Sequence, residues 1–298
     1  MRVFVTGATG FIGSAIVQEL IGAGHQVVGL ARSDEKARAL AEAGAEVHRG
    51  DLTDLESLKS GAAGSDGVIH TGFIHDFARI HEVCEVDRHA IGALASALEG
   101  FDRPLVVTSG TAMLAGNPIA TEETLPRTGP DAWPRVATEE AAAAARARGV
   151  RSIVVRLPPS VHGDGDHGFV PILIGIAWER GVSAYVGDGN NRWPAVHRLD
   201  AARLYRLALE KGAAGAVYHG VAEQGVPFRE IASVIGRRLG VPVVSRRPEE
   251  AAEHFGWFTP FAVIDAPASA AITSEKLGWR PDQPGLITDV DRPSYFGR

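Results

Sequence analysis

The sequence predicts an α/β protein with a Rossmann-type, doubly wound parallel sheet and a smaller C-terminal region. Three observations support this fold class. Short apolar runs alternate with Ala- and Leu-rich stretches of helical spacing through the first half of the chain. A glycine-rich segment directly follows the first apolar run. From about residue 157 the alternation loosens into loops rich in proline and glycine.

The apolar runs define the elements in order. We expect parallel strands at 2–6, 26–30, 45–48, 67–71, 104–108 and 152–156, joined by right-handed helical crossovers. In the second half, helical spacing predicts helices at 168–180, 199–211, 228–240 and 267–277. We therefore divide the chain into a first domain at 1–156 and a second region at 157–298, with a later strand near 194–212 returning to the first domain.

Size and composition exclude several classes of protein. With 298 residues, 45% of them hydrophobic, the chain can bury a full core. A net charge of -6, with arginine pairs only at 237–238 and 246–247, provides no electrostatic footprint for nucleic acid. Cys84 is the only cysteine, which excludes disulfides within the chain and Cys-based zinc sites and fits a reducing compartment. No apolar run reaches membrane-spanning length, so we expect a cytoplasmic protein that does not enter a membrane.

The segment VTGATGFIGSAIV at 5–17 has the pattern of a phosphate-binding loop. A strand that ends at Thr6 and passes through glycines into a helix lets backbone N–H groups approach a pyrophosphate. The positive end of the helix dipole lies behind those groups. The contacts predicted here are Gly7, Thr9, Gly10, Phe11, Ile12 and Gly13.

The end of the second strand indicates which dinucleotide the loop prefers. In such folds a carboxylate at this point accepts a hydrogen bond from the ribose 2′-hydroxyl, whereas an arginine accommodates a 2′-phosphate. The chain has Leu-Ala-Arg-Ser at 30–33, with no acidic residue at the tip. We therefore predict NADP(H), with contacts from Arg32 and Ser33, and 1–156 becomes an NADP-binding domain. Alternatively, Arg32 is an ordinary exposed arginine beside the acidic residues that follow it.

The segment TGATGFIG resembles the TGxxGxxG fingerprint of the short-chain dehydrogenase/reductase superfamily, in its extended and atypical, epimerase/dehydratase-like form. GDLTD at 50–54, VIHTGF at 68–73 and RLPPSVHG at 156–163 are similar to later segments of that superfamily, as are stretches at 186–204 and 275–281. The resemblance covers nearly the whole chain and implies that the region 157–298 mainly binds substrate. It also implies further cofactor contacts from Asp51, Leu52, Thr71, Gly72, Thr108, Pro158 and Ser160.

The catalytic pair of the superfamily is missing. Its members use a Tyr that protonates the substrate oxygen and a Lys four residues later. Here one alignment places Arg135 and Glu139 at those positions, and no Tyr precedes Tyr185. No Lys lies between residues 59 and 211, so neither member can stand in this helix in any register.

Another group must therefore donate a proton, or the substrate must need little help. The residues nominated as catalytic are Ser109 and Thr111, which flank Gly110 at the position of the superfamily's Ser or Thr, and His162. Arg135, Glu139 and His75 are further candidates. Each candidate also has a structural alternative. Ser109 or Thr111 could cap the end of the strand, and His162 could serve in packing or loop hydrogen bonding. His75 could belong to the polar start of the helix that begins near residue 77. The His- and Asp-containing loop 162–168 lacks the spacing of a metal site, and we predict no metal.

These residues predict an NADPH-dependent oxidoreductase that transfers hydride to a carbonyl or imine carbon of a small molecule, as a monomer or homodimer. An iminium substrate carries its own positive charge and needs no strong acid. The alternatives are a non-catalytic NADP(H)-binding redox sensor and a sugar-nucleotide epimerase or dehydratase. Trp193 and Trp257, in loop-like contexts, are the tryptophans most suited to a substrate pocket.

Overall fold

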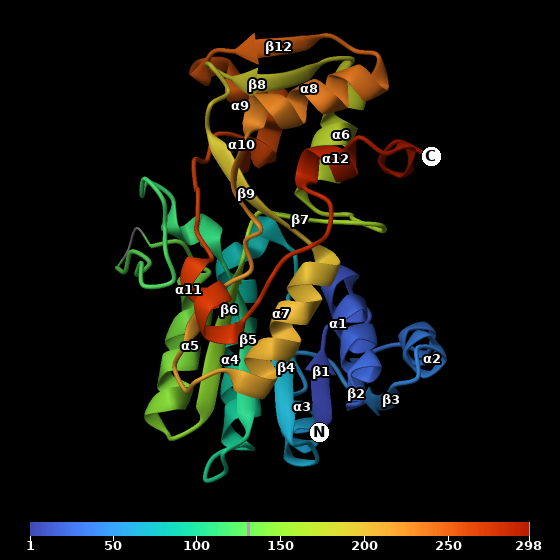
Figure 1. Ribbon diagram of the computed structural model, residues 1–298, viewed down its shortest axis with the longest axis vertical. Coiled ribbons are helices and arrows are strands. Elements are labelled where there is room, and N and C mark those ends of the chain that lie inside the picture. Colours follow the sequence, from blue (N-terminus) through green and yellow to red (C-terminus); the bar gives the residue numbers. More distant parts are fainter. Residues whose placement is uncertain (130–131, 298) are drawn as a thin grey trace.

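Residues 1–129 and 132–297 are described by a computed structural model, which consists of two bodies stacked along the long axis (Figure 1). The lower body is a seven-stranded sheet in the order β10-β6-β5-β4-β1-β2-β3, in which every neighbouring pair is parallel. The strands are β1 (Arg2–Thr6), β2 (Gln26–Ala31), β3 (Glu46–Arg49), β4 (Gly67–His70), β5 (Pro104–Gly110), β6 (Arg151–Leu157) and β10 (Val217–His219).

Helices cover both faces of this sheet. Successive residues of β1 point to opposite faces, so Val3 and Val5 pack into one apolar cluster and Phe4 into the other. The first cluster is covered mainly by α1 (Phe11–Gly22), α2 (Asp34–Glu42), α7 (Arg198–Lys211) and α11 (Ala271–Leu277). The second is covered by α3 (Leu55–Ala63), α4 (Ile80–Ser96) and α5 (Val136–Ala147). The Rossmann-type α/β fold is thus confirmed.

The order of the strands creates the point at which such sheets bind ligands. The chain runs outward from β1 to β3 and then crosses back to β4 on the other side of β1. Loops that leave the carboxyl ends of β1 and β4 therefore diverge and leave a crevice between them. The glycine-rich loop and the segment after His70 lie at these two ends.

The strand that returns to the sheet differs from the expected one. We expected it near 194–212, but that segment forms the end of β9 (Arg192–His197) and helix α7. The returning strand is β10, which pairs with β6. Helix α7 itself does return and packs beside α1 (Figure 1). The division of the chain at residue 156 stays a prediction.

The upper body contains two small sheets, β11-β9-β7 and β12-β8. Their strands are β7 (Ser160–His162), β8 (Ser183–Val186), β9, β11 (Glu223–Pro227) and β12 (Val243–Arg246). The accompanying helices are α6 (Phe169–Arg180), α8 (Phe228–Leu239), α9 (Ala251–Phe255), α10 (Thr259–Ala262) and α12 (Leu286–Val290). Trp193 is fully buried in this body, and its indole N–H donates to the carbonyl of Phe261 at 3.1 Å.

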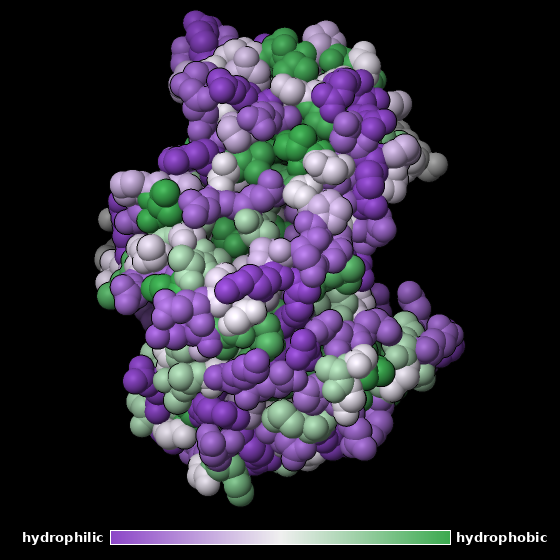
Figure 2. All heavy atoms as spheres, viewed as in Figure 1, coloured by the Kyte–Doolittle hydropathy of each residue, from purple (hydrophilic) through white to green (hydrophobic). Residues whose placement is uncertain are grey.

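The surface is polar over most of the face shown in Figure 2, with apolar areas on the upper body and where it meets the lower one. Of the helices in the described part of the chain, none is both long and apolar enough to span a membrane.

Candidate nucleotide and active site

The glycine-rich loop is packed against its neighbours so closely that side chains do not fit. Gly7 has φ +66°, and a Cβ on it would lie 2.7 Å from the amide nitrogen of Gly72. A Cβ on Gly13 would lie 2.0 Å from the carbonyl oxygen of Gly7. The Gly10 N–H donates to that same carbonyl at 2.8 Å. The turn therefore brings backbone, and no side chain, to the N-terminus of α1, as a dinucleotide pyrophosphate requires.

The segment after β4 forms the opposite wall of this loop. Thr71 donates its hydroxyl to the Thr6 carbonyl at 2.8 Å, and the Gly72 N–H donates to the Thr6 hydroxyl at 3.2 Å. A Cβ on Gly72 would lie 2.9 Å from a methyl carbon of Leu52. The structure thus brings together three separate predicted segments, the loop, Thr71–Gly72 and Leu52. The carboxylate of Asp51 accepts bonds from the backbone and hydroxyl of Thr53, at 3.0 and 2.9 Å, and so orders this turn.

The tip of β2 carries an unpaired positive charge. Arg32 is exposed and, among the described residues, has no hydrogen-bond or ion-pair partner. Ser33 caps α2 by accepting from the Lys36 N–H at 3.3 Å. The nearest carboxylate in sequence, Asp34, forms an ion pair with Arg49. The side chain at this tip that remains available to a ligand is therefore a cation.

Beneath the loop, buried polar groups connect β1, β4, α4 and α5. His70 bonds to the Thr6 hydroxyl at 2.7 Å through Nδ1 and to the Asp87 carboxylate at 3.0 Å through Nε2. Asp87 also accepts the Thr138 hydroxyl and lies 3.3 Å from a guanidinium nitrogen of Arg135. Burial opposes ionisation of Asp87, but Arg135, His70 and Thr138 outweigh it and lower its pKa. The network therefore holds β1, β4, α4 and α5 together below the crevice.

Arg135 is the residue directly before α5, and one alignment places it at the superfamily's Tyr. Its guanidinium donates to the Thr108 carbonyl at 2.8 Å and sits 3.7 Å from the centre of the Phe73 ring. The Thr108 hydroxyl bonds to the His70 carbonyl at 2.9 Å and to the Tyr205 hydroxyl at 2.6 Å. Arg135 is therefore a fixed cation at the ends of β4 and β5.

Glu139 lies one turn further along α5, and the same alignment places it at the Lys. It accepts the Ser109 hydroxyl at 2.8 Å and forms a two-bond ion pair with Arg156, at 2.7 and 2.8 Å. Arg156 also donates to the Thr124 carbonyl at 2.9 Å and contacts His219 at 3.3 Å. Burial, together with the charge of Arg156, lowers the pKa of His219 to about 4, so this ring is neutral near pH 7.

Two nominated hydroxyls remain without partners. Thr111 Oγ1 and Ser160 Oγ are buried and make no hydrogen bond to any residue that the structure describes. A buried hydroxyl without a partner costs about 1–3 kcal/mol unless a ligand or water satisfies it. Pro158, two residues before Ser160, is buried as well.

His162 occupies a different network. Its ring is buried and bonds to the Asp289 carboxylate at 2.8 Å. The Tyr295 hydroxyl bonds to the Gly163 backbone N–H at 2.9 Å and to Asp166 and Asp289, both at 3.3 Å. These contacts fasten loop 163–168 to the end of the chain, in keeping with a packing role for His162, and its catalytic role stays a prediction.

Asp166, in the same loop, predicts a pH dependence. Burial raises its pKa to about 6, from an ordinary 3.8. An acid with a raised pKa stabilises the fold below its unfolded pKa and loses that contribution as the pH rises through its folded pKa. Relative to the wild type, Asp166→Asn should gain on the order of 2 kcal/mol in free energy of unfolding between pH 4 and pH 7. Urea unfolding at the two pH values measures the change; a constant difference would contradict this assignment.

Aromatic side chains form the wall between the two bodies. Phe73 and His75 follow β4 and contact each other at 5.4 Å, and Phe77 stacks on Trp257 at 5.5 Å. Desolvation, with the positive charges of Arg135 and nearby His167, lowers the pKa of His75 and favours a neutral ring. Trp257 is 56% exposed whereas Trp193 is core. Of the two tryptophans considered, only Trp257 therefore faces solvent beside the crevice.

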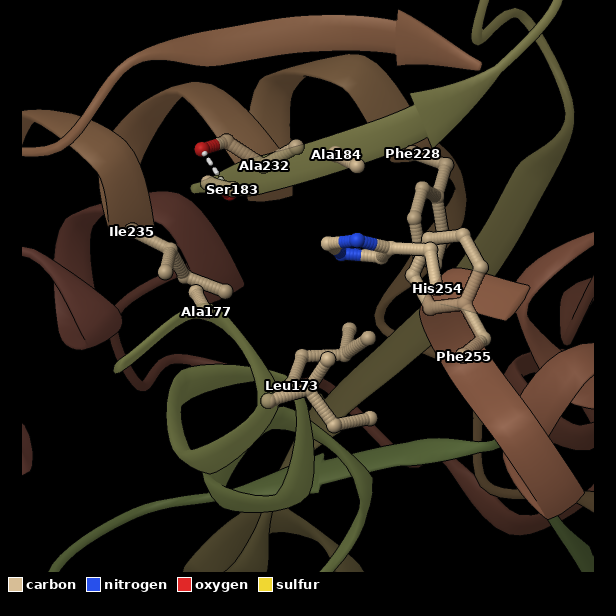
Figure 3. Close-up of a pocket in the computed structure, with 10 residues that line it drawn as sticks. Leu173, Ala177, Ser183, Ala184, Phe228, Ala232, Ile235, His254 and Phe255 are labelled. Carbon is tan, nitrogen blue, oxygen red and sulfur yellow. Dashed lines mark hydrogen bonds between the residues drawn. The ribbon is translucent and has the colours of Figure 1, made fainter. Parts of the chain in front are cut away.

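Two hollows lie elsewhere. The one in Figure 3 is lined by residues of α6, β8, α8 and α9, with the His254 ring pointing into it, and its volume of about 10 Å³ leaves room for no more than about one water. The other, of about 270 Å³, lies between α4 and α5 beside the charged residues Glu85, Arg88 and Glu140. Neither hollow includes a residue of the glycine-rich loop.

Known proteins are similar to this chain over nearly its whole length. The profile of the NAD dependent epimerase/dehydratase family matches residues 3–221. The chain is 51% identical over 297 residues to uncharacterized protein C2A9.02 of Schizosaccharomyces pombe, covering 99% of this chain and 100% of that protein. It is also 51% identical over 300 residues to uncharacterized protein YLL056C of Saccharomyces cerevisiae, covering 99% of each.

More distant proteins carry descriptive names. The 2-alkyl-3-oxoalkanoate reductase of Stenotrophomonas maltophilia is 29% identical over 263 residues, covering 83% of this chain and 78% of that protein. Among solved structures, dTDP-glucose 4,6-dehydratase from Streptomyces venezuelae, with NAD and TYD bound, superposes with a TM-score of 0.78 at 21% identity, covering 99% of this chain and 97% of that one. The chain therefore belongs to the NAD-dependent epimerase/dehydratase family of the extended short-chain dehydrogenase/reductase superfamily.

Proposed function

We propose that the protein is an NADPH-dependent oxidoreductase that transfers a hydride to a carbonyl or imine carbon of a small organic substrate. When bound, the reduced nicotinamide supplies the hydride, and the substrate oxygen or nitrogen takes up a proton. The observation that carries the proposal is the fixed guanidinium of Arg135 at the ends of β4 and β5. A cation at this point stabilises negative charge that develops on a carbonyl oxygen. The same charge disfavours an iminium ion, so we place carbonyl substrates first.

Thr111 is the proposed hydrogen-bond donor to the substrate. Ser109 has a single hydroxyl proton and donates it to Glu139 at 2.8 Å, a contact that the Glu139–Arg156 pair holds in place. Ser109 donates to a substrate only if it releases Glu139, and it is the second candidate. Thr111 has a buried hydroxyl that no described residue satisfies, so it gains a bond if a substrate atom reaches it. His162, already paired with Asp289, is the weaker candidate. A relative of this chain with reductase in its name supports the same class of chemistry.

The preference for NADP(H) rests on the charge at the tip of β2. Arg32 is exposed and unpaired among the described residues, and Asp34 is paired with Arg49. A 2′-phosphate would meet a free guanidinium here, whereas residues 30–33 offer no carboxylate to a ribose 2′-hydroxyl.

Charge reversal at the tip of β2 tests the cofactor preference. Arg32→Glu should lower the affinity for NADPH at least about tenfold and change the affinity for NADH much less, because the 2′-phosphate then faces a like charge. Arg38→Glu is the matched control, since Arg38 is also exposed, on the following helix. Titration of both reduced dinucleotides by tryptophan fluorescence measures the ratio. An unchanged preference for NADPH in Arg32→Glu would refute the assigned contact.

Two other functions have support. A redox sensor that binds NADP(H) without catalysis is favoured by the absence of a Tyr–Lys pair from this helix and by the internal pairing of both Arg135 and Glu139. A sugar-nucleotide epimerase or dehydratase is favoured by the family itself. The sensor predicts tight binding without turnover, and the third function predicts conversion of a sugar nucleotide without net consumption of reduced cofactor.

A further inference from the structure

Arg198 lies beside the N-terminus of α1. It is the first residue of α7, which packs along α1 (Figure 1). Its guanidinium carbon lies 5.0 Å from the centre of the ring of Phe11, the first residue of α1. The glycine-rich loop leads directly into Phe11, so this cation stands next to the predicted pyrophosphate site.

No carboxylate neutralises Arg198 among the described residues. One guanidinium nitrogen donates to the backbone carbonyl of Asp164 at 2.6 Å. The carboxylate of Asp164 is engaged elsewhere, 2.9 Å from Arg292. A guanidinium has five N–H donors, so Arg198 keeps its full charge and most of its donors for a ligand.

The side chain is held in position from two sides. A Cβ on Gly163, whose φ is +138°, would lie 2.8 Å from Cγ of Arg198, so the glycine makes room for the arginine stem. His167, from the same loop, contacts the Phe11 ring at 5.7 Å. Loop 163–168 and Arg198 thus approach the same residue of α1, and the guanidinium is not a free surface charge.

We propose that Arg198 binds the diphosphate of the dinucleotide held at the glycine-rich loop. The N-terminus of a helix supplies about half a positive charge through its N–H groups, less than the two negative charges of a diphosphate. Arginine adds a full charge and paired hydrogen bonds to phosphate oxygens. The inference requires that the chain binds a dinucleotide and is independent of whether it transfers hydride.

Ligand fragments test this role. In Arg198→Gln, the dissociation constant of 2′-phospho-ADP-ribose, measured by calorimetry, should rise about tenfold. Adenosine 2′-phosphate, which lacks the diphosphate, should bind within twofold of wild type. Arg180→Gln, which removes an exposed arginine from the end of α6, is the control and should change neither value. ADP-ribose is titrated in parallel, because its response to Arg198→Gln does not depend on the 2′-phosphate.

A second variant separates charge from packing. Arg198→Lys keeps the charge and should lose less affinity for 2′-phospho-ADP-ribose than Arg198→Gln does. Unchanged binding of both diphosphate ligands in Arg198→Gln would overturn the proposal. An equal loss for adenosine 2′-phosphate would also overturn it, because it would show a general disturbance of the site. If only the predicted preference for NADP(H) is wrong, the wild type should bind 2′-phospho-ADP-ribose and ADP-ribose equally well, while Arg198→Gln still weakens the binding of both.

Discussion

Gly13→Ala is expected to lower the affinity for a nicotinamide dinucleotide roughly 100-fold. The added Cβ would lie 2.0 Å from the carbonyl oxygen of Gly7 and 3.1 Å from Cα of Ala8. Both contacts are backbone atoms of the loop and cannot rotate away. The N-terminus of α1 must therefore move away from the loop, and its N–H groups no longer converge on a pyrophosphate.

Gly22→Ala is the matched control for this effect. Gly22 is the last residue of the same helix, and a Cβ there meets no atom within 4 Å. The substitution should leave the affinity for the dinucleotide unchanged, because the added methyl group displaces no atom and lies at the opposite end of the helix from the loop. Alanine also favours the helical conformation over glycine, so the helix should not be destabilised. Calorimetric titration, with thermal unfolding of each variant, measures both properties. Wild-type affinity in a folded Gly13→Ala protein would show that the nucleotide does not use this loop.

Glu139→Leu is expected to lower the free energy of unfolding by about 3–5 kcal/mol. The side chain of Arg156 is only 1% exposed, and that of Glu139 is 12% exposed. Removal of the carboxylate leaves the guanidinium buried with the Thr124 carbonyl and His219 as its remaining partners. An uncompensated buried charge is much less favourable than the loss of the pair as a whole.

The double variant tests this interpretation of the buried pair. Glu139→Leu combined with Arg156→Met removes both charges and should be less destabilised than Glu139→Leu alone. Urea unfolding of the wild type, both single variants and the double variant gives the coupling energy. Additive losses in the double variant would mean that the two side chains act independently.

Local patterns in the sequence predicted most of the lower body. The six strands from β1 to β6 were predicted because each is a short run with apolar residues between helical stretches. The inner strands are buried on both faces, whereas the edge strand β3 is largely exposed. The seventh strand was misplaced because β10 has only three residues, Val217–His219, too few for a periodic signal. The apolar run near 194 has the pattern expected of a returning strand, but it forms β9 of a separate sheet.

The glycine-rich turn was also predictable, since its glycines lie within one short segment of sequence. The buried contacts at the ends of β4 and β5 were not, because they join residues far apart in the chain. Glu139 meets Arg156 from another strand, and Asp87 meets His70 across two elements. Arg156 is the first residue of the segment RLPPSVHG, whose resemblance to the superfamily marks it as a candidate site residue. No pattern in the sequence, however, pairs it with Glu139. Arg198 carried no local signal, since its role depends on the approach of α7 to α1.

The measurement that tests the central claim most directly is oxidation of NADPH and NADH, followed by the absorbance of the reduced nicotinamide, against ketones, aldehydes, cyclic imines and sugar nucleotides. The account predicts turnover with NADPH in preference to NADH, on a carbonyl compound before an imine. Tight NADPH binding with no turnover on any compound would contradict the oxidoreductase function and favour the sensor. Conversion of a sugar nucleotide without net NADPH oxidation would contradict it in favour of an epimerase or dehydratase.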